Sequence, residues 1–155
     1  MLVEFDILPK ESRLWIYASE HRLTDTQQDY ILNTLNDHLR GWEAHKVSLT
    51  AGVKIIANHF IIVALDESEN KASGCSIDTL QNKIQQIENK LSISLLNRLN
   101  IFCLLDDDIV CIPSFNLKNN VNKDTLFYDL TIKSKSQIHS FLKPISEGWC
   151  AKLVD

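Results

Sequence analysis

The clearest regularity in the sequence lies in residues 77–91. Apolar side chains recur there at steps of three and four, which places them in one stripe along a helix whose other faces are polar. The stripe consists of Ile77, Leu80, Ile84, Ile87 and Leu91. Ser76 is the expected N-cap residue, and Asp78 then falls in the first turn, where the helix dipole favours negative charge. The pattern therefore predicts an amphipathic helix with one face in the core.

Five shorter runs are apolar, β-branched or aromatic and predict strands. They are residues 14–18, 47–57, 60–65, 101–105 and 109–112. Asn58-His59 joins the second and third runs as a tight turn, and the aspartates 106–108 join the last two. Thr24 and Gln27 form a capping box, and the apolar residues that follow at helical intervals predict a helix over about 25–41.

The order of these elements predicts the fold. Through residue 112 it is β-α-β-β-α-β plus one hairpin strand, as in a ferredoxin-like α+β sandwich, although another α+β topology stays an alternative. Beyond Pro113, Ser134 and Gln137 form a last capping box and Pro144 ends the helix that follows, so the C-terminal extension is expected to be helical. No repeat or linker interrupts the chain. We expect one domain over residues 1–155, with a core of about 12–113 and an extension of 114–155.

The composition is that of an ordinary folded protein, and it excludes several functional classes. The 155 residues fit one domain, with 45% hydrophobic and 23% charged residues. The net charge is −4 and no Lys/Arg cluster is present, so we expect no nucleic-acid partner. No apolar run approaches the ~18–20 residues of a membrane span. The start, MLVEFDILPKESR, does not have the pattern of a signal peptide, so a cytoplasmic location is expected.

The four cysteines predict neither a metal site nor a disulfide framework. Cys75, Cys103, Cys111 and Cys150 lack CxxC spacing and histidines at zinc-site intervals, so no metal ligands are expected. Cys103 and Cys111 are placed evenly about Asp107 and would face each other across a hairpin with a three-residue turn. In a reducing compartment, however, free thiols are the expectation. The aspartates around Asp107 predict a solvated turn rather than half of a cation site.

The ferredoxin-like plan gathers several polar residues at one pole of the sandwich. This pole contains the end of the third strand, the start of the second helix and the loop that leaves the first helix. The candidate ligand-binding residues at this pole are Trp42, Asp66, Glu67, Ser73, Gly74, Ser76 and Asp78. The same plan places His45 near Cys75 and sends His21 and His59 to the opposite pole.

Cys75 admits a catalytic and a structural interpretation. A thiol beside a helix N-terminus can be activated by the backbone dipoles, with His45 as the base, but the nearby carboxylates Asp66 and Asp78 oppose thiolate formation. Alternatively, Cys75 is a small buried apolar residue, Gly74 serves a turn with positive φ, and the polar residues after it cap the helix. Trp42 lies on an apolar helical stripe, which favours a core position for it.

Four strings resemble a family of small bacterial proteins of uncharacterised function. They are LWIYAS, Trp42-x-x-His45, FIIVALDES and ASGCSID, and the resemblance covers most of the chain. Members often carry the label "ABC transporter ATPase", but this chain has no GxxxxGK[ST] motif and no ABC signature, so the label predicts no ATP hydrolysis. The resemblance implies that residues 66–67, 73–78, Trp42 and His45 belong together.

Three functions remain open. The leading hypothesis is a cytoplasmic protein that binds a small ligand or a protein partner at the pole around Ser73–Asp78. The second is a thiol-dependent enzyme with Cys75 as nucleophile and His45 as base. The third is an assembly module that forms a homodimer through its sheet face. No pattern names a cofactor, a ligand or a reaction.

Overall fold

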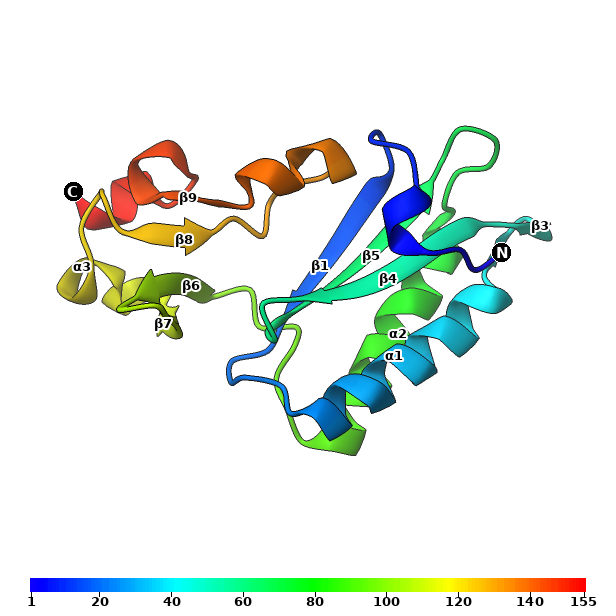
Figure 1. Ribbon diagram of the computed structural model, residues 1–155, viewed down its shortest axis with the longest axis horizontal. Coiled ribbons are helices and arrows are strands. Elements are labelled where there is room, and N and C mark those ends of the chain that lie inside the picture. Colours follow the sequence, from blue (N-terminus) through cyan, green and yellow to red (C-terminus); the bar gives the residue numbers. More distant parts are fainter. The chain divides into compact units, whose positions relative to one another are not determined.

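The computed structural model describes residues 1–155, which fold into two compact units (Figure 1). Unit 1 comprises Met1–Leu96 and Lys133–Ser136, and unit 2 comprises Asn97–Ile132 and Gln137–Asp155. Antiparallel sheets and helices together make the chain an α+β protein, as the sequence predicts. The expectation of a single domain stays a prediction. No helix combines the length and apolar character that crossing a membrane requires.

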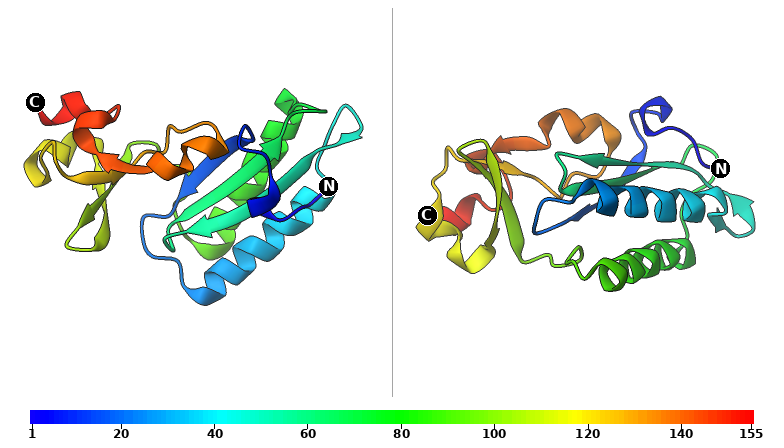
Figure 2. Two further views of the ribbon diagram at one scale, coloured as in Figure 1. Left: turned by 45° about the horizontal axis from the view of Figure 1, so that its top comes forward. Right: turned by 60° about the horizontal axis from the view of Figure 1, so that its bottom comes forward.

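Unit 1 is built on a three-stranded antiparallel sheet with the order β1-β5-β4. Its strands are β1 (Arg13–Ala18), β4 (Thr50–Ile56) and β5 (Phe60–Asp66). Two long helices, α1 (Asp25–Arg40) and α2 (Gly74–Leu91), cover one face of this sheet (Figures 1 and 2). A short hairpin, β2 (Glu43–Ala44) with β3 (Val47–Ser48), follows α1 and was not predicted.

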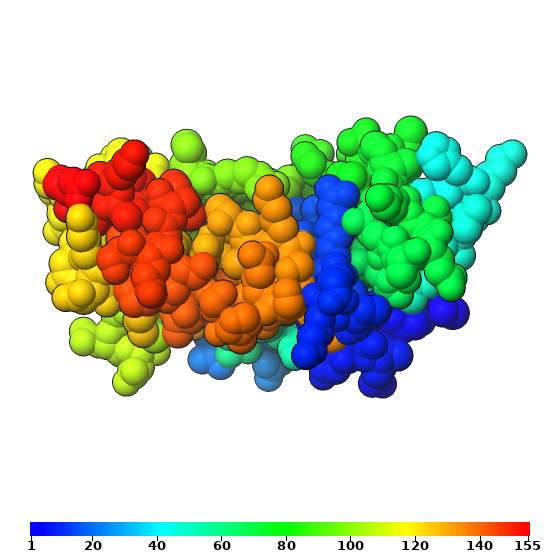
Figure 3. All heavy atoms as spheres, turned by 90° about the horizontal axis from the view of Figure 1, so that it is seen from above, coloured from blue at the N-terminus to red at the C-terminus, as the bar shows by residue number.

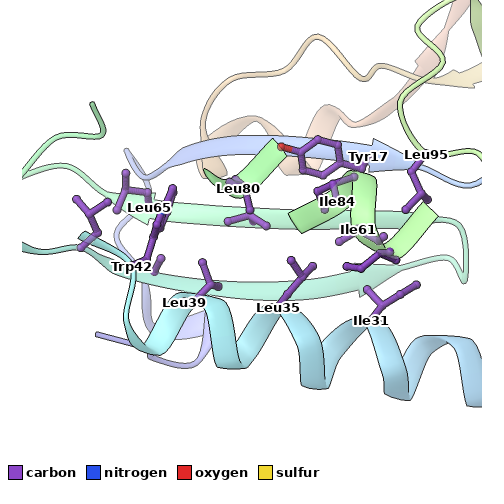
Figure 4. Packing of buried hydrophobic residues seen from close by; sticks show 14 of the residues in the cluster. Tyr17, Ile31, Leu35, Leu39, Trp42, Ile61, Leu65, Leu80, Ile84 and Leu95 are labelled. Atoms are coloured by element: carbon purple, nitrogen blue, oxygen red, sulfur yellow. The ribbon is translucent and has the colours of Figure 1, made fainter. Parts of the chain in front are cut away.

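The core of unit 1 lies between the two helices and the sheet. Side chains of both helices point toward the strands, and Trp42 lies near Leu65 at one end of the layer (Figure 4). The fully buried residues of this core include Ile31, Leu35, Leu39, Ile61, Val63, Leu65, Leu80, Ile84 and Ile87. The predicted stripe of α2 is thus its buried face, and the predicted capping box of α1 is present, since Thr24 accepts from the Gln27 amide and donates its own amide to Gln27.

Short segments from the chain ends pair with both edges of this sheet. Val3 N donates to Ala51 O (2.9 Å), which places the N-terminal segment beside β4 in parallel orientation. At the other edge, Leu14 N donates to Lys133 O (3.0 Å) and Lys135 N donates to Ser12 O (2.9 Å). Such pairing satisfies backbone groups that an open edge strand would leave exposed.

Unit 2 contains a four-stranded antiparallel sheet with the order β7-β6-β8-β9. Its strands are β6 (Asn100–Leu105), β7 (Asp108–Pro113), β8 (Leu126–Tyr128) and β9 (Leu142–Pro144). In the ferredoxin-like plan the fourth strand pairs with the first. Here β6 pairs with β7 on one edge and β8 on the other, so it has no free edge for β1 and that pairing was predicted wrongly.

The C-terminal part of the chain differs from the predicted helical extension. It contains one four-residue α-helix, α3 (Leu117–Asn120), the two short strands β8 and β9, and several 3₁₀ turns. The 3₁₀ segments of the whole chain are Phe5–Ile7, Ser114–Asn116, Lys135–Ser140, Ile145–Glu147 and Ala151–Val154. In place of the helix expected after Ser134 the chain forms the 3₁₀ segment Lys135–Ser140 and then β9, so Pro144 lies in a strand and does not end a helix.

The turn between β6 and β7 corrects the expected placement of two cysteines. Leu105 pairs with Asp108, so the turn has two residues, Asp106 and Asp107, both with positive φ, as in a type I′ hairpin. This shorter turn moves the register by one, and Cys103 lies opposite Val110 rather than Cys111. None of the four cysteines forms a disulfide. Burial, followed by the neighbouring thiols, raises the pKa of Cys103 to about 12, so this thiol is unreactive at neutral pH.

Candidate functional site

The N-terminus of α2 begins three residues earlier than the sequence predicts. Ser73, not Ser76, is the N-cap, and the two serines form a reciprocal capping box: Ser76 N donates to Ser73 Oγ (3.1 Å) and Ser73 N donates to Ser76 Oγ (2.7 Å). Two serines three residues apart satisfy two backbone N–H groups, which one capping serine at position 76 cannot do. Asp78 consequently lies beyond the first turn, and its side chain is exposed.

Gly74 does not serve the turn that was expected of it. No glycine in the chain has positive φ, and Gly74 is the first residue of α2. A Cβ at this position would meet no atom within 4 Å. Neither backbone conformation nor close packing therefore requires a glycine here.

Trp42 belongs to the core rather than to an open binding surface. Its side chain is buried, and its Nε1 donates to Ser76 O (2.8 Å), so it ties the loop after α1 to the first turn of α2. The indole also packs edge-to-face on Trp15, with ring centroids 5.8 Å apart. The histidine next to it is His38, whose ring lies 6.1 Å away. Burial, and then the charge of Lys83, lower the pKa of His38, which favours its neutral form.

Glu67 organises the loop that joins β5 to α2. Its Oε2 accepts a hydrogen bond from Ala72 N (3.0 Å) and lies 3.8 Å from the Arg13 guanidinium. That guanidinium in turn stacks 4.7 Å from the ring centroid of Trp15. Asn70 adds a second tie, since its Nδ2 donates to Val47 O (3.0 Å) on β3. The loop is therefore held by Glu67, which the sequence singled out, and by Arg13 and Asn70, which it did not.

Cys75 and His45 are not arranged as a nucleophile and its base. Both side chains are exposed, and no hydrogen bond joins them to each other or to another group. His45 and Lys46 form the two-residue turn of the β2–β3 hairpin, with φ of 54° and 65°. The position of His45 follows from this turn, and the structure places no base within hydrogen-bond reach of the thiol.

Asp66 and Glu67 border a cleft of about 340 Å³ at the end of β5. The segment that precedes β1 forms its other wall, and Figure 3 shows this blue segment beside the green segment that follows β5. The lining residues are Pro9, Glu11, Ser12, Asp66, Glu67 and Ser68. Asp66 Oδ1 accepts from Ser68 N (3.0 Å), which turns the chain at the rim of the cleft.

Sequence reasoning missed four residues at this cleft, of which Glu11 and Ser12 are two. These two precede β1, and Arg13 pairs with Leu65 in the sheet, so the antiparallel register carries them to the end of β5. The predicted strands could have indicated this position, because residues just before one antiparallel strand lie opposite the residues just after its partner. A separate cleft, lined in part by His21 and Ser92, lies at the other end of β1, where His21 was expected.

No protein-family model, curated protein or solved structure matches the chain. The resemblance to the small bacterial family with the SGCSID string therefore stays a prediction. Function has to be inferred from the geometry around α2 and the cleft beside β5.

Proposed function

We propose that this protein is a binding module whose ligand or partner site lies at the end of unit 1 around Ser73–Asp78, with the cleft beside β5 as its pocket. The observation that carries the proposal is the pocket itself: two of the residues singled out from the sequence, Asp66 and Glu67, border an open space of about 340 Å³. Open, concave spaces with a few convergent polar groups are the usual form of ligand sites.

The surrounding hydrogen bonds support this proposal. The loop that carries Asp66 and Glu67 is anchored by Glu67 to Ala72 N, and the N-terminus of α2 is anchored by Trp42 to Ser76 O. A rim held in this way loses little conformational freedom when a ligand binds, and this lowers the entropic cost of association. Trp42, Ser73, Gly74, Ser76 and Asp78 do not line the cleft. Trp42 and Ser76 are buried, and their hydrogen bond holds the first turn of α2, to which the loop after Glu67 leads.

The thiol-dependent enzyme remains the second candidate, favoured only by the exposure of Cys75 in the first turn of α2. We also infer that unit 1 is a reduced form of the ferredoxin-like sandwich. Its strand order β1-β5-β4 and its two helices on one face correspond to three of the four strands of that plan. The cytoplasmic location, the SGCSID family and a homodimer through the sheet face stay predictions; light scattering at micromolar concentration tests the dimer.

One experiment separates the two candidates. Amide shifts in ¹⁵N–¹H NMR spectra are followed while three five-carbon probes of different charge are added: glutarate, 1,5-pentanediol and 1,5-diaminopentane. We expect at least one probe to shift amides of residues 10–12 and 66–73 saturably, equally in the wild type and in Cys75→Ser. The binding-module proposal is refuted if no probe shifts these amides. In parallel, a Cys75 thiol that reacts with iodoacetamide far faster than a free model thiol at pH 7 would favour the enzyme.

A further inference from the structure

The cleft beside β5 carries an excess of negative charge. Glu11, Asp66 and Glu67 line it, and the one cation paired with them is Arg13, 3.8 Å from Glu67 Oε2. Lys10 lies between two lining residues in the sequence but does not line the cleft itself. Glu11 and Asp66, which have no ion-pair partner, thus both lie at the space, so an anionic ligand is disfavoured and a cationic one is attracted.

Acceptor oxygens remain free at this cleft. Glu67 Oε2 is already engaged by Ala72 N and Arg13, and Asp66 uses Oδ1 for Ser68 N. No hydrogen bond occupies Asp66 Oδ2 or the Glu11 carboxylate. These oxygens can accept N–H donors from a ligand without breaking a bond that holds the loop.

Ser12 provides a second observation that is independent of the charges. Only 2% of the residue is exposed, and its Oγ has no hydrogen-bond partner. Buried hydroxyls are nearly always paired, and an unpaired one is unfavourable. Ser12 lines the cleft, and a rotation about its χ1 changes the direction of the hydroxyl while the backbone stays in place. A ligand donor in the cleft would supply the missing partner.

The chemistry of the lining disfavours two kinds of cation, metal ions and quaternary ammonium groups. No group of three or more His, Cys, Asp or Glu side chains is arranged to hold a metal ion. None of the six lining residues is aromatic, and quaternary ammonium groups are recognised mainly by aromatic faces. A primary ammonium has three N–H donors and no acceptor, which matches the Asp66 carboxylate, the Glu11 carboxylate and the Ser12 hydroxyl. We therefore propose that this cleft, which is the pocket of the proposed function, binds a primary alkylammonium group.

Two sources supply this chemistry, a free diamine and the lysine side chain of a peptide. The NMR titration above distinguishes them when Nα-acetyl-lysinamide is added to the probe set. We expect 1,5-diaminopentane to shift amides of residues 10–12 and 66–68 at concentrations at which 1,5-pentanediol and glutarate do not. Stronger binding of the lysine derivative identifies a peptide source, and stronger binding of the diamine identifies a free amine. If only glutarate or pentanediol shifts these amides, the ammonium inference is overturned but the binding-module proposal is not. If no probe shifts them, both proposals are refuted.

Variants test the named groups. Asp66→Asn keeps the oxygen that accepts from Ser68 N and removes the charge, so we expect amine binding to weaken about tenfold. The matched control is Asp29→Asn, an exposed acid on α1, which should bind as the wild type does. Ser12→Ala should also weaken amine binding while leaving the thermal unfolding temperature unchanged or higher, because the hydroxyl it removes is unpaired. Wild-type amine affinity in both Asp66→Asn and Ser12→Ala would overturn the proposal.

Discussion

Replacement of Trp42 by phenylalanine tests whether the conspicuous tryptophan near the SGCSID string is a structural residue. The indole is 2% exposed, and its Nε1 donates to Ser76 O at 2.8 Å. Phenylalanine keeps part of the ring contact with Trp15 but has no donor and a smaller ring system. The substitution therefore removes one buried hydrogen bond and leaves a cavity at the junction of α1, β5 and α2.

The two losses can be given magnitudes. Thr79 Oγ1 also donates to Ser76 O (2.8 Å), so this acceptor is not left unpaired and the lost bond costs its net value, about 1 kcal/mol. The cavity left by the missing part of the indole costs about 1–2 kcal/mol further, at the low end of large-to-small core changes. We expect Trp42→Phe to lower the free energy of unfolding by about 2–3 kcal/mol in total.

Urea unfolding followed by far-UV circular dichroism measures this difference without relying on the fluorescence of the residue that is changed. Trp149→Phe is the matched control, because it is the same substitution at a side chain that is 51% exposed. The control should change stability by less than about 0.5 kcal/mol. If Trp42→Phe cost no more than the control, the placement of Trp42 as a core anchor would be refuted.

Two further predictions concern backbone packing and a buried ion pair. Gly52→Ala should destabilise by about 1–3 kcal/mol in thermal unfolding, since its Cβ would lie 2.6 Å from the carbonyl oxygen of Val3, whereas Gly74→Ala should be neutral or stabilising; equal unfolding temperatures would contradict this. Burial raises the pKa of Asp129, but hydrogen bonds from Lys143 and Thr131 lower it more, so its net pKa lies below the ordinary 3.8. Its contribution to stability is therefore present above pH 3.8 and is lost as the pH falls through the lowered pKa. Asp129→Asn should cost about 2–3 kcal/mol in urea unfolding at pH 7 and clearly less near pH 2; an equal cost at both pH values would contradict the ion pair.

Local patterns were sufficient for most elements of unit 1. The apolar stripe of α2 and the capping box of α1 depend on residues three and four apart, so a short window of sequence contains the whole signal. The turn of the β4–β5 hairpin includes the predicted Asn58 and His59 but also Ala57, because Ile56 pairs with Phe60; Ala57 and Asn58 both have positive φ. The residues at the end of β5 and the start of α2 were placed at one end of the sheet by the assumed ferredoxin-like order of the elements, not by a local pattern.

Local patterns failed where the same short stretch of sequence is compatible with two alternative helix starts or turn lengths. Ser73 and Ser76 can each cap a helix, and the choice of Ser73 depends on the reciprocal hydrogen bonds that the pair makes. The aspartates 106–108 allow a turn of two or three residues, and pairing of the whole β6–β7 hairpin selects two. A one-residue change of this kind moves Cys103 away from Cys111 and reverses the face of each side chain.

The sequence by itself therefore determined the α+β class, the two long helices and the strands β1, β4 and β5, because their signals repeat within a few residues. Only the tertiary structure decided the rest. It paired β6 with β8 instead of β1, brought residues 133–136 to the edge of β1, and placed Glu11 and Ser12 beside Asp66. These arrangements join residues tens of positions apart, and they are selected by the burial and hydrogen bonding of the whole chain rather than by any short stretch of it.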